Sequence, residues 1–175
     1  MISVHNLIQD PKPTSVDAWT RFGGTSSQVE LRMTTNGKEI YVRNVTATDG
    51  RGVSHTMQLD AGRYVFGFYL ENCGSYNVGT RIMAIKAGDE YIADVRYDAK
   101  QKFYFTGFDS DGKTPVQLML VLPPVAEGFA AAQYFLLCTA ADYEIISHIY
   151  EQQGDLSAPW FDGDTGLTLS LGGGA

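Results

Sequence analysis

The sequence contains few cysteines, few basic residues and no long apolar run. Its two cysteines, Cys73 and Cys138, form no Cys-x-x-Cys pair, so we expect free and mostly buried thiols rather than a zinc or redox site. The 13 lysines and arginines are scattered and the net charge is −7, which disfavours nucleic acid as a partner. A membrane-spanning helix needs about 18 consecutive apolar residues, and no stretch of this sequence is that long, so we expect no membrane insertion.

Catalytic signatures are missing as well. The three histidines, His5, His55 and His148, lie in no His-x-His or His-Glu-x-x-His pattern, and no Gly-x-Ser-x-Gly motif, P-loop or dinucleotide fingerprint occurs. Most acidic pairs fall at turns, where aspartate is common in any protein. We therefore expect no enzyme and no cofactor. Residues 1–5 lack the basic and apolar regions of a secretory signal, so we expect folding in the cytoplasm of the producing cell.

Glycine and tyrosine are abundant, with 19 and 10 residues. This pairing favours many short strands joined by tight turns. Polar and apolar residues alternate along much of the chain, as at Val29 and Leu31, which would share one face of a strand. Asn36-Gly37 then predicts a hairpin turn. The alternation and the turn signals together predict strands at 28–34, 38–45, 53–59, 63–71, 79–86, 90–97, 102–108 and 116–122.

Residues 128–146 are ambiguous, because three consecutive alanines at 130–132 favour a helix by propensity. We predict further strands there, since a lone helix would need its own place against the core. The turn spacing then predicts an all-β protein, a sandwich of two antiparallel sheets. Its single domain would span residues 1–170, with a glycine-rich tail at 171–175. His55, on an apolar strand face, is expected to be a hydrogen-bonded core histidine rather than a ligand.

Three short motifs resemble a known family. Near the start, Asn6-Leu7-Ile8-Gln9-Asp10-Pro11 is followed by Trp19. The run Leu-Asp-Ala-Gly-Arg-Tyr-Val-Phe occupies residues 59–66, and Ala-Pro-Trp-Phe-Asp-Gly-Asp-Thr occupies residues 158–165. Together they resemble the carbohydrate-binding-module-like domains found in minor tail and tail-tip proteins of actinobacterial siphophages.

The resemblance implies a jelly-roll, galactose-binding-like β-sandwich built into a bacteriophage virion. The chain would be a structural minor tail or tail-tip component that aids host adsorption, with other tail proteins and further copies of itself as partners. The alternative is an adhesin module that binds a host cell-wall or surface polysaccharide, gaining avidity from its copy number. A glycan-degrading enzyme is the least favoured interpretation, because no catalytic constellation can be named.

Aromatic residues supply the candidate site. Outward rings could stack on sugars or lie at subunit contacts, although a core or interface position is the favoured interpretation. The candidates on or beside predicted strands are Tyr41, Tyr69, Tyr76, Tyr91, Tyr97 and Tyr104. The closing motif is predicted to be a turn that anchors the C-terminal strand, rather than a ligand site. Its residues are Trp160, Phe161, Asp162, Gly163 and Asp164.

A structural calcium ion stays open as an alternative at one turn. The run Asp109-Ser110-Asp111-Gly112 resembles the opening of a calcium-binding loop. Leu120 stands at the twelfth position, where such a loop requires glutamate. Turn chemistry alone also accounts for aspartates at this place.

Overall fold

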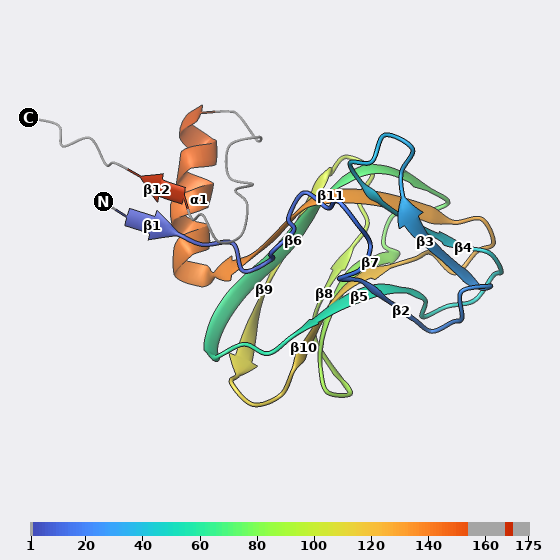
Figure 1. Cartoon of the computed structure of the whole chain (residues 1–175), viewed down its shortest axis with the longest axis horizontal. Coiled ribbons are helices and arrows are strands. Elements are labelled where there is room, and N and C mark those ends of the chain that lie inside the picture. Colours follow the sequence, from blue (N-terminus) through green and yellow to red (C-terminus); the bar gives the residue numbers. More distant parts are fainter. Residues whose placement is uncertain (1, 154–166, 170–175) are drawn as a thin grey trace, which may run out of the picture.

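The computed structural model describes residues 2–153 and 167–169, which form a sandwich of two five-stranded antiparallel sheets (Figure 1). We name each sheet after its central strand. The β10 sheet contains, in spatial order, β2 (Thr20–Phe22), β5 (Gly52–Met57), β10 (Val116–Val121), β7 (Arg81–Ala87) and β8 (Glu90–Arg96). The β11 sheet contains β3 (Val29–Met33), β4 (Ile40–Asn44), β11 (Phe129–Thr139), β6 (Ala61–Gly74) and β9 (Phe103–Asp111).

The strands predicted between residues 28 and 122 are all present, as β3 to β10. The predicted hairpin is confirmed too: β3 pairs with β4 in the register Val29↔Asn44, and Gly37 in the turn has a φ of 69°. Such a left-handed conformation suits glycine because it has no Cβ. The local alternation of polar and apolar residues therefore predicted the sandwich correctly.

The prediction of strands throughout 128–146 is wrong in its second half. Strand β11 ends at Thr139, and the helix α1 (Ala140–Gln153) follows directly. The Thr139 hydroxyl accepts a hydrogen bond of 3.1 Å from the amide of Asp142, which caps the first turn of the helix. The helix does not need a place inside the sandwich, because Ile146 packs on the outer side of β11 against Leu136 and Cys138.

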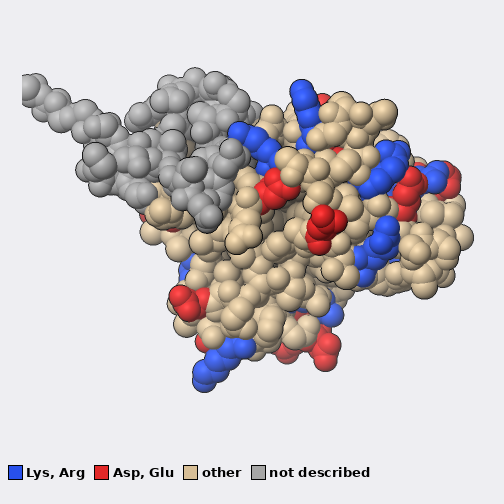
Figure 2. Space-filling view, viewed as in Figure 1, with Lys and Arg blue, Asp and Glu red and all other residues tan. Residues whose placement is uncertain are grey.

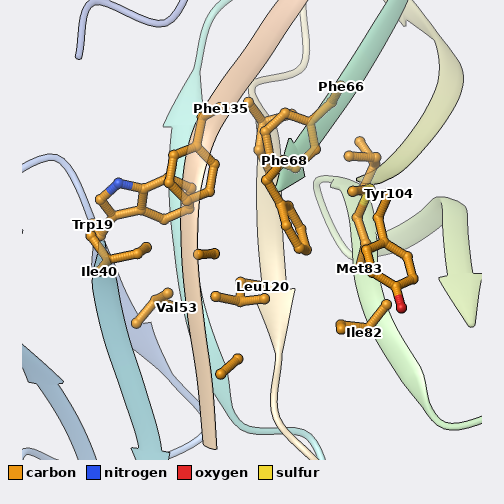
Figure 3. Packing of buried hydrophobic residues seen from close by; sticks show 14 of the residues in the cluster. Trp19, Ile40, Val53, Phe66, Phe68, Ile82, Met83, Tyr104, Leu120 and Phe135 are labelled. Atoms are coloured by element: carbon orange, nitrogen blue, oxygen red, sulfur yellow. The ribbon is translucent and has the colours of Figure 1, made fainter. Parts of the chain in front are cut away.

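The core lies between the two sheets and is rich in aromatic rings (Figure 3). Phe135 of β11 packs against Trp19 at 4.5 Å between ring centroids, and against Phe68 of β6 at 5.9 Å. Tyr104 of β9 is only 1% exposed and extends this row toward the β10 sheet. Aromatic packing of this size accounts for much of the buried apolar surface that stabilises the sandwich.

The N-terminal segment completes the β11 sheet where β4 ends. Strand β4 pairs with β11 only from Phe129 to Ala132, and beyond that point the segment 6–11 takes its place. The buried Asn6 side chain donates to the carbonyl of Phe135 at 2.9 Å and accepts from the amide of Leu137 at 3.1 Å. The Asn6 and Trp19 positions of the N-terminal motif are thus structural anchors.

A small layer lies at one end of the sandwich (Figure 1). There β1 (Ile2–Val4) pairs with β12 (Leu167–Leu169) beside α1, and Val4 is buried against the helix contact. The motif at residues 160–164 and the tail at 171–175 lie outside the described residues. Within residues 2–153 and 167–169, no helix is long and apolar enough to cross a membrane.

Candidate functional site

The outer face of the β11 sheet is divided into a covered half and an open half. In the covered half, α1 and β1 bury Leu136 and Cys138 of β11, and Tyr143 of the helix packs on Phe105 of β9 at 5.6 Å. Burial also raises the pKa of the Cys138 thiol to about 12, so it is not a reactive thiolate. Among the described residues, α1 and β1 leave the other half of this face open, over β3, β4 and the first part of β11.

The open half contains a groove of about 490 Å³, which we call the β11 groove. It crosses the strands rather than following them, because its lining residues come from four neighbouring strands and the β3–β4 turn. They are Arg32, Thr34, Thr35, Asn36, Glu39, Tyr41, Glu71, Asn72, Phe129 and Ala131. The volume lies within the range of about 300–1,000 Å³ that is usual for small-molecule sites.

The floor of the β11 groove is aromatic. Tyr41 on β4 stacks on Phe129 of β11 with 5.4 Å between centroids and 27° between planes. The Arg32 guanidinium lies 4.2 Å from the Tyr41 ring centroid, within cation–π distance. Arg32, Tyr41 and Ala131 are cross-strand partners in one row, so the small alanine leaves a depression next to the tyrosine.

The sides of the β11 groove are polar. The Gln133 amide donates to the Glu71 carboxylate at 3.2 Å, which fixes an acceptor beside the aromatic floor. Glu39, which is nearly buried, accepts from the Thr34 hydroxyl and from Asn36 in the β3–β4 turn. An aromatic floor flanked by carboxylate and amide groups can stack a flat ring that has an apolar face and can bind hydroxyl groups at its edge.

An ion-pair network stiffens the β3–β4 side of the groove. Glu30 binds both Arg32 and Arg43 at 2.7 Å, and Arg43 also pairs with Glu127. The hydrogen bond from Arg32 and the charge of Arg43 lower the pKa of Glu30, although partial burial opposes this shift. The network holds Arg32 over Tyr41 and presents no free nucleophile or base to the groove.

The structure separates the candidate tyrosines. Tyr104 lies in the core, and its hydroxyl donates to the carbonyl of Asp98 at 2.9 Å. Its place among the candidate glycan or interface rings is therefore wrong. Tyr76 and Tyr97 are partly buried next to it, with 5.2 Å between their own rings. Tyr69 is on the outer face of the β11 sheet but packs against Phe103 and Tyr134. Tyr41 and Tyr91 each line a groove on the surface of the described residues.

Sequence reasoning missed Arg32, Glu71, Phe129 and Gln133. Alternation along β3 and β4 shows that Arg32 and Tyr41 point away from the core, so the sequence pattern could have identified Arg32 as an outward-facing residue. The other three depend on the register between β11 and β6, which contains bulges after Ala131 and after Gln133. No local pattern in the sequence marks these bulges.

His55 lies beside the core on β5, with 5.7 Å between its ring and that of Trp19. Its Nδ1 atom is buried without a hydrogen-bond partner, and burial lowers the pKa of the ring despite a bond to the backbone of Ala18. The histidine is therefore a neutral, only partly satisfied core residue. Its ring contact with Trp19 agrees with the structural interpretation of this position.

The suggested calcium loop is a turn. Asp111 accepts hydrogen bonds from the amides of Lys113 and Thr114 at 2.7 Å, which lowers the pKa of its carboxyl to about 2. Across residues 2–153 and 167–169, no group of three or more histidine, cysteine, aspartate or glutamate side chains is placed to hold a metal ion. Cys73 and Cys138 are free thiols, as predicted.

Comparison with known proteins finds solved structures of similar fold. No family model and no curated protein sequence matches the chain. Among solved structures, the CBM22-1 xylan-binding domain of Paenibacillus barcinonensis Xyn10C is similar with a TM-score of 0.54 and 10% identity, over 78% of this chain and 92% of that one. The module TmCBM61 in complex with beta-1,4-galactotriose is similar with a TM-score of 0.51 and 16% identity, over 77% and 98%.

A viral protein is also similar in structure. The enzymatically active domain of Bacteriophage CBA120 tailspike protein 4 matches with a TM-score of 0.52 and 12% identity, over 75% of this chain but only 21% of that one. At such identities the likeness concerns the fold alone. The chain therefore has the jelly-roll sandwich fold of carbohydrate-binding modules.

Proposed function

We propose that this protein is a non-enzymatic glycan-binding module and that the sugar chain lies across the β11 groove. The observation that carries the proposal is the stacked pair Tyr41 and Phe129 on an open sheet face, flanked by the Glu71–Gln133 hydrogen bond. A pyranose has a flat C–H face that packs on aromatic rings and hydroxyl groups that bind carboxylates and amides. The fold shared with xylan- and galactan-associated modules supports this assignment.

The charges of the β11 groove favour a neutral polysaccharide. Two carboxylates, Glu39 and Glu71, and one cation, Arg32, line it. An acidic sugar would meet this excess of negative charge at close range, in a chain whose net charge is already −7. Because the groove crosses four strands and is open along its length, it can accept the interior of a long chain as well as its end.

Calorimetric titration with soluble neutral polysaccharides, xylan and β-1,4-galactan first, tests the proposal. The Tyr41→Ala variant removes most of the stacking surface, so we expect its affinity to fall about tenfold or more. The matched control is Tyr91→Ala, which removes a tyrosine from the opposite sheet and should leave neutral-glycan binding unchanged. Absence of binding by the unmodified protein, or equal losses in both variants, would contradict the proposal.

A second candidate function is compatible with the first: a minor tail or tail-tip component of a bacteriophage virion. It is supported by the motif resemblance at residues 6–11, 19 and 59–66, and by the fold shared with a tailspike domain. Several copies held by other tail proteins would turn weak sugar contacts into firm adsorption. Mass spectrometry of purified virions tests this location, and absence of the chain from virions would remove the candidate.

A further inference from the structure

A second groove lies on the opposite side of the sandwich, on the outer face of the β10 sheet. It measures about 420 Å³, and we call it the β10 groove. Its lining comes from β2, β7, β8 and β10 and from three connecting loops. The residues are Phe22, Asp49, Gly50, Thr80, Arg81, Tyr91, Arg96, Val121, Leu122 and Pro124.

Tyr91 is the exposed ring of this groove. It lies on the edge strand β8, is 51% exposed, and is the one aromatic ring among the exposed large hydrophobic side chains of the described residues. The floor beside it is apolar, because Phe22 packs there against Val121 and Met119 of β10. An exposed aromatic ring next to an apolar floor offers a stacking surface for a sugar ring.

Basic groups surround the Tyr91 ring. The Arg81 guanidinium carbon lies 4.6 Å from the ring centroid, and the Lys86 ammonium lies 5.2 Å from it. Lys86 is the cross-strand partner of Tyr91, so the strand register sets this contact. Arg96, the cross-strand partner of Arg81, adds a third cation on the same face.

The arginines keep donor groups available. Both bind the same carboxylate oxygen, Asp94 Oδ2, through their Nε atoms, at 3.2 Å from Arg81 and 3.1 Å from Arg96. In the described part of the chain, the terminal Nη groups of Arg81 take part in no hydrogen bond, whereas Nη1 of Arg96 donates to the carbonyl of Gly79 at 3.5 Å. Arg81 and Arg96 are the basic residues that line the β10 groove and Asp49 is the acidic one, so its lining has an excess of positive charge although the whole chain is acidic.

We propose that the β10 groove is a separate binding site for an acidic sugar, a hexuronate residue of a polysaccharide. The sugar ring packs against the exposed surface of Tyr91, and its carboxylate accepts hydrogen bonds from the Nη groups of Arg81 and from Nη2 of Arg96. Guanidinium groups suit this ligand because their planar donor fork matches a planar carboxylate. This site goes beyond the neutral-glycan function of the β11 groove and does not depend on it.

The test is calorimetric titration of the full chain with a short oligogalacturonate, with the neutral oligogalactan of equal length as the comparison. We expect the oligogalacturonate to bind and its affinity to fall as the salt concentration rises. Arg81→Gln and Tyr91→Ala should each weaken it about tenfold or more, since charge-assisted hydrogen bonds and ring stacking contribute on that scale. Lys100→Gln removes one exposed charge elsewhere and should change little.

Asp94→Asn is expected to strengthen oligogalacturonate binding, whereas Arg81→Gln and Tyr91→Ala weaken it. The substitution removes the carboxylate that competes for both arginines, so oligogalacturonate binding should strengthen severalfold. Thermal unfolding of each variant checks that the fold is retained. The proposal is overturned if oligogalacturonate does not bind, if the two oligosaccharides bind equally to the Tyr41→Ala variant, or if Lys100→Gln weakens binding as much as Arg81→Gln does.

A further variant separates this proposal from the proposed function. Tyr41→Ala should weaken neutral-glycan binding at the β11 groove about tenfold or more while leaving oligogalacturonate binding intact. If Tyr41→Ala instead weakens the acidic ligand and Tyr91→Ala does not, both ligands use the β11 groove and the β10 site is wrong.

Discussion

The outer faces of the two sheets differ in both cover and charge. The β11 sheet carries α1 and β1 over half of its outer face and leaves a groove lined by Glu39, Glu71 and Arg32. The β10 sheet has no helix over it among the described residues, and its groove is lined by Arg81, Arg96 and Asp49. On the face in view in Figure 2, acidic and basic side chains lie interspersed rather than in one large patch. The two grooves thus differ in the charge of their lining residues, and they lie on opposite faces of the sandwich.

The central strands differ in a similar way. Strand β10 is paired with β5 along its whole length, from Val116 to Val121. Strand β11 loses its β4 partner after Ala132, and the N-terminal segment fills the gap with hydrogen bonds to the bulged region. The central strand of the β11 sheet therefore takes one of its partners from outside the sheet's own strands, whereas β10 is paired with β5 and β7. The predictions below test this dependence.

The largest expected effect is at the helix contact. Ile146→Ala leaves a cavity between α1 and the outer side of β11, and we expect the free energy of unfolding to fall by about 3 kcal/mol. Urea denaturation followed by fluorescence measures this loss. Ser147→Ala, one position along the helix and partly exposed, should cost well under about 1 kcal/mol. Equal costs for the two variants would show that the helix adds nothing to the β11 sheet.

The next effect is at the N-terminal anchor. Asn6→Ala leaves the carbonyl of Phe135 and the amide of Leu137 buried without this partner, at an expected cost of about 2 kcal/mol. Hydrogen exchange should show faster exchange of the Leu137 amide than in the unmodified protein, with β10 amides little changed. Uniform acceleration in both sheets would contradict a local role for this segment.

The smallest effect concerns the interior of the β10 sheet, where His55 lies. The pKa of His55 is lowered in the fold, so below about pH 6.5 the unfolded chain binds a proton more readily than the folded one. Stability should therefore fall as the pH drops through that value and on toward the folded-state pKa. Urea midpoints at pH 7.5 and 5.5 measure the change. His55→Gln should reduce the dependence, and an unchanged dependence in that variant would contradict this origin.

The sequence predicted the strands well because alternation is a local property. Val29, Leu31, Ile40 and Val42 are all buried, as their two-residue spacing requires. It predicted Tyr41 as a candidate ring for the same reason, since Tyr41 stands between two buried neighbours. It failed at residues 140–146, because a strand and a helix are both compatible with a short apolar run. The choice depended on whether the outer face of β11 could accept a helix.

What the sequence by itself determined is the class of fold, the number of short strands between residues 28 and 122, and the absence of catalytic motifs. Tertiary structure alone decided which tyrosines reach a surface and which neighbours they meet there. Tyr104 and Tyr91 look equivalent in the sequence, yet one is buried and the other half exposed. The physical reason is that alternation assigns residues to two faces of a strand, whereas long-range register and bulges decide what lies opposite each face.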